Sequence, residues 1–177
     1  MRFTDSAATL TKMRIRVGFL ILVRLSFALA AQIEHVAGGE DMGLGVSALR
    51  TKLTEPFGVD FGSNGDWYIC EYKGQRILRV DKAGKAHAFA GTGLPGYSGD
   101  GGPAKEATFR DPHGIVVTRQ DVMYVADMLN HTVRRIDPKT GVITTVAGTG
   151  KAGFSGDGGP GVNAMFNGTS GNRVKPG

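Results

Sequence analysis

Two aspartates that could serve as metal ligands lie 57 residues apart in this sequence. Asp100 and Asp157 each occur in the sequence Ser-Gly-Asp-Gly-Gly-Pro. Calcium prefers about six to eight oxygen ligands, whereas each of these loops supplies one carboxylate and one hydroxyl. We expect both aspartates mainly to shape turns, because glycine accepts positive φ angles and aspartate bonds its own backbone. Both are retained as candidates for a divalent metal site.

His113 is the single residue with the broadest chemical potential. It follows Pro112 and precedes an apolar run that is typical of a strand. An imidazole at this point could contact a polar ligand or bind a divalent metal. The residue 56 positions earlier is Phe57, which cannot coordinate a metal. Three metal ligands cannot be assembled from these positions, so His113 is a candidate for ligand contact and only secondarily for metal binding.

Other kinds of catalytic chemistry find little support. Ser98 and Ser155 lie in glycine loops rather than in a Gly-x-Ser-x-Gly turn between a strand and a helix. The glycines precede neither a Lys-Ser/Thr pair nor a helical segment, which excludes a phosphate-binding loop of the Walker type. Cys70 is the only cysteine, which excludes an intrachain disulfide. We therefore favour a protein that is not an enzyme, and we predict no cofactor.

The elements that position these residues are short strands in a repeated unit. Three pairs of segments match without gaps: 55–61 with 111–117, 68–81 with 124–137, and 91–109 with 148–166, the last with 12 of 19 positions identical. Short apolar runs separated by Gly, Asn, Asp and Pro predict four strands in each unit. The expected strands are 58–61, 67–70, 76–81 and 85–90, then 114–118, 122–126, 132–137 and 142–147. Four antiparallel strands per repeat of this length are typical of a propeller blade.

The predicted fold class is all-β, a partial β-propeller of four-stranded antiparallel blades. Two full blades at about 55–90 and 111–147 precede an incomplete third repeat in residues 148–177. The motifs Pro-His-Gly-Ile (112–115), Tyr-Val-Ala-Asp (124–127) and the segment from Asn130 to Arg135 resemble those of the NHL repeat family. The insert Gly-Thr-Gly-x-x-Gly-x-Ser-Gly-Asp-Gly-Gly-Pro is similar to one found between blades of exported bacterial NHL proteins. The resemblance covers about residues 36–171.

The resemblance implies a scaffold that binds a protein, peptide or glycan ligand through loops on one face. The loop before the first strand and the loop between the second and third strands emerge at the same end of a blade. The candidates on this face are His113, Asp127, Asn130 and His131, together with Tyr97 and Phe154 on the long inserts. Alternatively, the two insert aromatics hold their own glycine loops against the blade. In this family the acid at the position of Asp127 and Glu71 usually ties the next turn to neighbouring backbone.

The resemblance also leaves a second activity open. Other propellers of this kind are metal-dependent hydrolases or lyases of the gluconolactonase or amidating-lyase type. In that case the remaining metal ligands would lie in blades outside this sequence. Arg79 and Arg135, at matching positions of the third strands, are expected to be ion-paired or to lie over neighbouring blades.

The first thirty residues carry most of the positive charge. They hold five basic residues and one acid, a net charge of +4 out of the chain's +5, which leaves about +1 for the remainder. Such a remainder excludes a general basic surface for nucleic acid. Basic residues, an apolar run and the sequence Ala28-Leu29-Ala30 predict a signal peptide in residues 1–30, with Met13 as a possible first residue. We therefore expect an extracytoplasmic protein without stable membrane insertion after cleavage.

The number of blades predicts that the chain is part of a longer protein. Propellers of this family close with about six blades, and residues 167–174 do not repeat the start of the second blade. Both outward blade faces are expected to be apolar, and open strand edges can pair with other chains. Self-association through the open blades is therefore expected.

Overall fold

The computed structural model describes residues 20–25, 31–40 and 43–168. Its strands are β1 (Leu20–Leu25), β2 (Ala31–Ala37), β3 (Pro56–Phe61), β4 (Trp67–Glu71), β5 (Arg76–Val80), β6 (Ala86–Ala90), β7 (Pro112–Val117), β8 (Met123–Asp127), β9 (Thr132–Ile136) and β10 (Ile143–Ala147). Three short 3₁₀ turns complete the regular structure of these residues: η1 (Ala104–Glu106), η2 (Met128–Asn130) and η3 (Gly161–Asn163). No helix in the described part of the chain is long and apolar enough to cross a membrane.

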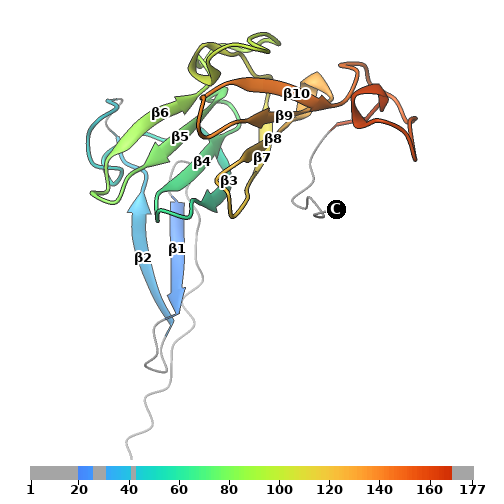
Figure 1. Cartoon of the computed structure of the whole chain (residues 1–177). Coiled ribbons are helices and arrows are strands. Elements are labelled where there is room, and N and C mark those ends of the chain that lie inside the picture. The colour runs from blue at the N-terminus through green and yellow to red at the C-terminus, as the bar shows by residue number, and fades with distance from the viewer. Residues whose placement is uncertain (1–19, 26–30, 41–42, 169–177) are drawn as a thin grey trace, which may run out of the picture.

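The strands form two four-stranded antiparallel sheets, as the repeat predicts. Blade 1 has the order β3-β4-β5-β6 and blade 2 the order β7-β8-β9-β10 (Figure 1). The inner strands begin two residues earlier than expected, because each continues across a bulge. Pro56 pairs with Glu71 before the bulge, and Pro112 pairs with Asp127 in the same way. A bulge bends a strand without ending it.

The backbone at the blade turns repeats as closely as the sequence does. Glu55 and Asp111 have φ angles of 49° and 53°, and Gln75 and His131 have φ angles of 52° and 53°. Residues other than glycine rarely adopt this left-handed region, which costs about 1–2 kcal/mol. Contacts at these turns must therefore stabilise the same strained conformation in both blades.

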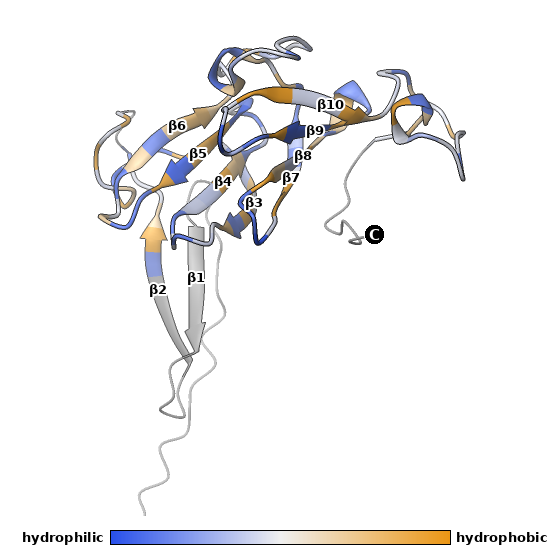
Figure 2. Cartoon of the chain, viewed as in Figure 1, coloured by the Kyte–Doolittle hydropathy of each residue, from blue (hydrophilic) through white to orange (hydrophobic). Residues whose placement is uncertain are grey.

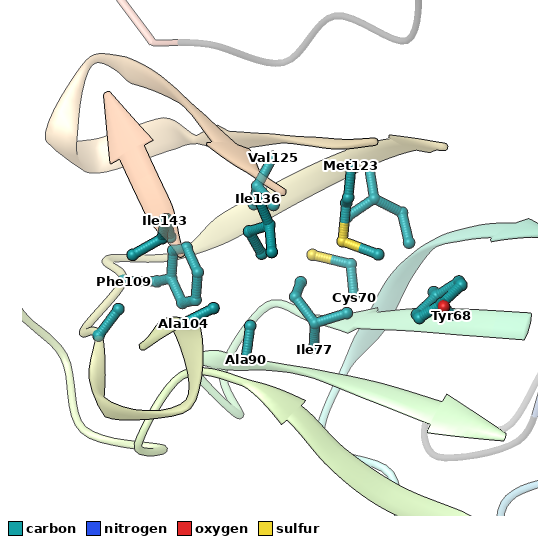
Figure 3. Close-up of a cluster of buried hydrophobic side chains, with 12 residues drawn as sticks. Tyr68, Cys70, Ile77, Ala90, Ala104, Phe109, Met123, Val125, Ile136 and Ile143 are labelled. Atoms are coloured by element: carbon teal, nitrogen blue, oxygen red, sulfur yellow. The ribbon is translucent and has the colours of Figure 1, made fainter. Parts of the chain in front are cut away.

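The inner strands of the two blades lie side by side. The Val117 amide donates to Asp60 Oδ2 at 2.7 Å. A Cβ atom on Gly58 would lie 3.3 Å from the Ile115 nitrogen, so glycine permits the close approach. The sheets then face each other across an apolar core (Figure 3), formed by Tyr68, Cys70, Ile77, Ala90, Ala104, Ala107, Phe109, Ile115, Met123, Val125, Ile136 and Ile143. This shared core joins the blades into one unit.

A second apolar cluster covers the other face of blade 1. Residues Ala37, Ala48 and Leu53 pack there against Ile69, Leu78, Val80 and Ala86. The segment is also bonded to the blade, since the Ala48 amide donates to the Gly84 carbonyl at 2.7 Å. The outward face of blade 1 is therefore apolar, as expected, but the chain's own preceding segment covers it.

The chain before the blades contains a two-stranded hairpin. β1 pairs antiparallel with β2, and the hairpin projects away from the blades (Figure 1). β1 lies within the predicted signal peptide. The rest of that segment, including Met13, Ala28 and Ala30, lies outside the described residues, so the signal peptide stays a prediction.

The third repeat begins with the same loop structure as the insert between the blades. In the first insert, bridges join Pro95 to Phe109 and Ser98 to Thr108. In the third repeat, equivalent bridges join residue 152 to residue 166 and residue 155 to residue 165. This loop protrudes beyond β10 (Figure 1). Residues 169–177 lie outside the described part.

Candidate functional site

The glycine-rich insert of residues 91–111 seals the outer side of the core between the blades. The amides of Gly101 and Ala104 each donate at 2.8 Å, to the carbonyls of Ile143 and Gly141 respectively. The insert thus runs along β10 of the following blade. We expected the insert around Tyr97 to Asp100 at the blade end that carries Asp127, and its continuation through residues 101–104 reaches the opposite end. Pairing with β10 accounts for this path, because it satisfies backbone groups that a free loop would leave to solvent.

Arg134 holds this insert in place from inside the core. Its side chain is fully buried, and its Nη2 donates to Asp100 Oδ1 at 2.7 Å and to the Ser98 carbonyl at 3.0 Å. Its guanidinium also lies over the rings of Tyr97 and Phe109, at 5.1 and 5.8 Å from their centres. Burial opposes ionisation of Asp100, but bonds from Thr145 and Arg134 outweigh it and lower its pKa. Asp100, a metal candidate in the sequence, is therefore neutralised by an arginine.

The sequence contained a signal for Arg134 that we did not use. Arg134 lies between Thr132 and Ile136 in strand alternation, so it faces the core (Figure 2 shows a hydrophilic segment within β9). The arginines expected to be ion-paired were the next residue, Arg135, and its counterpart in blade 1, Arg79. Arg79 lies 3.7 Å from Asp66 and Arg135 lies 2.9 Å from Asp137, which confirms that these arginines are ion-paired.

Asp127 organises the end of blade 2. Its Oδ1 accepts from the Arg110 amide at 2.8 Å, and Glu71 of blade 1 accepts from the equivalent Thr54 amide at 2.5 Å. These bonds confirm the backbone-tying role expected of this acid. Burial raises the pKa of Asp127 to about 6, against the opposing effect of its hydrogen bonds and of Arg134.

Asn130 and His131 connect blade 2 to the inserts on either side. The Asn130 amide group is buried and donates to Asp127 Oδ2 and to the Gly96 carbonyl, both at 2.8 Å. His131 Nδ1 accepts from the Gly168 amide at 3.1 Å, just as Gln75 Oε1 accepts from the Asp111 amide one repeat earlier. Both residues therefore form contacts within the propeller.

The two insert aromatics have different surroundings. The Tyr97 hydroxyl lies 2.9 Å from Thr145 Oγ1, so it joins the first insert to β10. Its counterpart Phe154 is 92 % exposed in the third repeat, and Asp157 nearby is exposed as well. Tyr97 therefore holds its own glycine loop against a blade, which was the alternative to ligand contact.

His113 lies in an aromatic cluster that we define as Phe57, Tyr72 and His113. Its ring centre is 4.2 Å from that of Phe57 and 6.0 Å from that of Tyr72, and the Phe57 and Tyr72 centres are 5.4 Å apart. Phe57 and His113 lie near the starts of the inner strands β3 and β7, and Tyr72 directly follows β4. Phe57 is 58 % exposed. The cluster therefore presents an aromatic surface at the end where the two inner strands begin.

Polar groups flank the aromatic cluster. Lys73 Nζ lies 4.4 Å above the centre of the Tyr72 ring and 2.7 Å from Asp111 Oδ2. Gln75 Nε2 donates to the other carboxylate oxygen at 2.7 Å. Burial opposes ionisation of Asp111, but the bonds from Lys73 and Gln75 outweigh it and lower its pKa. The site thus joins an apolar platform to a fixed ion pair, a combination common in binding pockets.

The predicted candidates at this end of the blades form two separate sets of contacts. His113 contacts residues of blade 1, whereas Asp127 and Asn130 contact each other. Sequence reasoning missed Tyr72. Within residues 20–25, 31–40 and 43–168, no three His, Cys, Asp or Glu side chains come together to hold a metal. The described geometry suits stacking and hydrogen bonding.

The two sheets, joined through their inner strands, define a β-propeller type of fold. Comparison with solved structures agrees. A protein of unknown function from Bacteroides thetaiotaomicron superposes with a TM-score of 0.63 at 21 % identity, over 78 % of this chain and 33 % of the other. An auxiliary nutrient binding protein from the same organism has a TM-score of 0.58 at 22 % identity, over 85 % and 36 %. At these identities the likeness establishes the fold.

Sequence comparisons support the NHL repeat resemblance. Residues 93–157 match the model of the Teneurin NHL domain. NHL repeat-containing protein 2 of Gallus gallus is 39 % identical over 127 residues, which cover 68 % of this chain and 17 % of that protein. Protein SUPPRESSOR OF QUENCHING 1, chloroplastic, of Arabidopsis thaliana is 31 % identical over 119 residues, 62 % of this chain and 11 % of its own length. The chain therefore spans less than a fifth of these relatives.

Proposed function

We propose that this chain is an NHL-repeat propeller module that binds a protein, peptide or glycan ligand at the aromatic cluster. The observation that carries the proposal is the exposed Phe57 ring, which packs at a tilt against His113 and Tyr72 where the inner strands begin. Exposed aromatic rings held in place by neighbours are frequent energetic centres of binding. Rigid strands beneath the loops keep the platform in position at little cost in conformational entropy.

The flanking ion pair supports a ligand with both apolar and polar parts. A ring or apolar side chain of the ligand would lie on Phe57, while its hydrogen-bonding groups would meet Lys73 and Asp111. Because Lys73 and Asp111 already bond each other, neither charge demands a fully charged partner. This arrangement suits a neutral sugar or an uncharged peptide segment.

Two substitutions in the aromatic cluster, with a control on the same strand as Phe57, test this function. Phe57→Ala and Tyr72→Ala should each reduce binding to positive members of a peptide and glycan array by about tenfold or more. Phe61→Ala is the control, because Phe61 ends the same strand β3 and is 47 % exposed. Array binding that is absent, or that survives both substitutions, would contradict the proposed site.

We also propose that the protein is exported. The basic start, the apolar run and Ala28-Leu29-Ala30 support a signal peptide with cleavage after Ala30 or Ala31. Cleavage there would remove β1 and leave β2 at the new amino terminus. Intact-mass measurement on protein recovered from outside the cytoplasm should show a chain that starts at residue 31 or 32. A mass that retains residues 13–30 would contradict cleavage.

A further inference from the structure

A cleft of about 370 Å³ lies between the blades, away from the aromatic cluster. It is lined by Arg79, His87, Ala88, Phe89, Pro103, Ala104, Lys105, Ile136, Thr140 and Gly141. Arg79 pairs with His87 at the end of blade 1 opposite Glu71, and Gly141 precedes β10 at the end of blade 2 opposite Asp127. The volume of the cleft is within the range of small-molecule sites. The cleft is therefore separate from the proposed ligand platform.

The walls of the cleft differ in chemistry. Phe89, Ala104 and Ile136 supply an apolar floor that continues into the shared core. Arg79, Lys105 and His87 supply positive or hydrogen-bonding groups from three different elements, β5, η1 and β6. An apolar floor with cationic groups at the rim is complementary to a small molecule that carries an apolar body and one negative charge.

The acids near the cleft pair with Arg79 and His87, and the pair with Arg79 is the longer of the two. Asp66 Oδ2 lies 3.7 Å from Arg79 Nη1, which is longer than a hydrogen bond, and the Arg79 side chain is 40 % exposed. Asp81 Oδ2 lies 2.7 Å from His87 Nε2, so that acid is directed at the imidazole. Lys105 is exposed and lies in the middle of η1. A carboxylate entering the cleft would meet the planar donors of Arg79 and the ammonium of Lys105.

We propose that this cleft binds a small monocarboxylate with an aromatic or branched aliphatic body. The carboxylate lies between Arg79 and Lys105, and the apolar body lies over Phe89 and Ile136. Thr140 supplies a hydroxyl at the opposite wall. Binding here bridges blade 1, the insert and blade 2, so it stabilises the packing of the two blades by mass action.

Equilibrium dialysis of the full chain with radiolabelled benzoate tests the proposal. Benzoate should bind at least tenfold more tightly than benzamide, which has the same ring without the charge, and more tightly than inorganic phosphate, which lacks the ring. Lys105→Gln should weaken benzoate binding at least threefold and Arg79→Gln about tenfold. Lys151→Gln is the charge-matched control, because Lys151 lies exposed in the third repeat.

Equal binding of benzoate and benzamide, unchanged binding in both cleft variants, or no benzoate binding at about 10 mM would each overturn the proposal. Lys105→Gln changes an exposed side chain, so the test stands even where Arg79→Gln disturbs the fold. Phe57→Ala should leave benzoate binding unchanged, which separates this site from the aromatic cluster. Loss of array binding with retained benzoate binding would contradict only the proposed function.

Discussion

Buried charges at the end of blade 2 explain why two similar acids behave differently. Asp127 is buried at the end of β8, where removal from water dominates and raises its pKa to about 6. Asp100 is partly exposed on the insert, where bonds from Thr145 and Arg134 outweigh burial and lower its pKa. Arg134 contacts both carboxylates, at 3.5 and 2.7 Å. The insert and the blade end are therefore linked through one guanidinium.

Arg134→Met should lower the free energy of unfolding by about 3–5 kcal/mol at pH 7. The substitution leaves the carboxylate of Asp127 buried without its cation, which is strongly destabilising. Arg135→Met is the neighbouring control, because Arg135 is half-buried in a surface ion pair and should cost less than about 1 kcal/mol. Urea unfolding followed by fluorescence of Trp67, the only tryptophan, measures both. Equal midpoints for the two variants would contradict the role of Arg134.

The raised pKa of Asp127 predicts a pH dependence of stability. Its pKa of about 6 in the folded state exceeds its ordinary value of 3.8. The folded state therefore holds the proton more tightly, and the contribution of Asp127 is greatest below pH 3.8 and falls as the pH rises to about 6. The fall amounts to at most about 3 kcal/mol.

Comparison of wild type with Asp127→Asn isolates this effect. The acids whose pKa values are lowered are present in both proteins, so their opposite pH dependence cancels. The stability of Asp127→Asn relative to wild type should rise between pH 4 and pH 6.5, measured by urea unfolding at several pH values. Parallel stability profiles would show that Asp127 does not titrate in this range.

At the scale of elements, the sequence repeat predicted the strands well. Short apolar runs bounded by Gly, Asn, Asp and Pro define all eight blade strands to within two residues, because strand alternation and turn chemistry are local properties. The path of the insert was not predictable in this way. Its pairing with β10 depends on contacts about forty residues ahead, such as Ala104 with Gly141. Local patterns carry no direct information on that pairing.

The same limit applies to the candidate site. Antiparallel topology alone predicted the end of the blade at which His113 lies. Its ring neighbours in blade 1 depend on how the two blades are placed against each other. Tyr72 was missed for that reason, since no repeat position marks it: its counterpart 56 residues later is Met128.

Two glycines of the first insert test how tightly it packs. Gly91 has φ of 87°, and an added Cβ would lie 2.6 Å from the Gln75 carbonyl. Gly101 has φ of 82°, but an added Cβ would meet nothing within 4 Å. Gly101→Ala should therefore cost about 1–2 kcal/mol from backbone strain alone, and Gly91→Ala clearly more. Thermal unfolding of both variants measures the difference, and equal losses would show that the insert is loosely packed at Gly91.

For the whole molecule, the two outward sides differ. Ala37, Ala48 and Leu53 cover the outer face of blade 1, whereas the third repeat protrudes beyond blade 2 with Phe154 92 % exposed and Val162 50 % exposed. Exposed apolar residues on a protruding element favour association. The self-association expected from the sequence should therefore involve the third repeat rather than blade 1.

Sedimentation velocity of the full chain tests this asymmetry. Wild type should form dimers or larger species at micromolar concentration, and Phe154→Asp should shift the distribution toward monomer. Leu49→Asp is the control, because Leu49 is 47 % exposed on the segment that covers blade 1. A monomeric wild type, or an equal effect of both substitutions, would contradict association through the third repeat.

The ion pair between Asp100 and Arg134 also constrains the order in which the chain can fold during synthesis. A ribosome delivers Asp100 thirty-four residues before Arg134, and the outer strand that receives the insert follows later still. Until then Phe109 and Ile77 have no opposite sheet to pack against. Each blade is thus completed only by the next, so the newest blade emerges with an unpaired insert and an uncovered apolar surface. During synthesis this growing end is the part of the chain that most needs protection from aggregation.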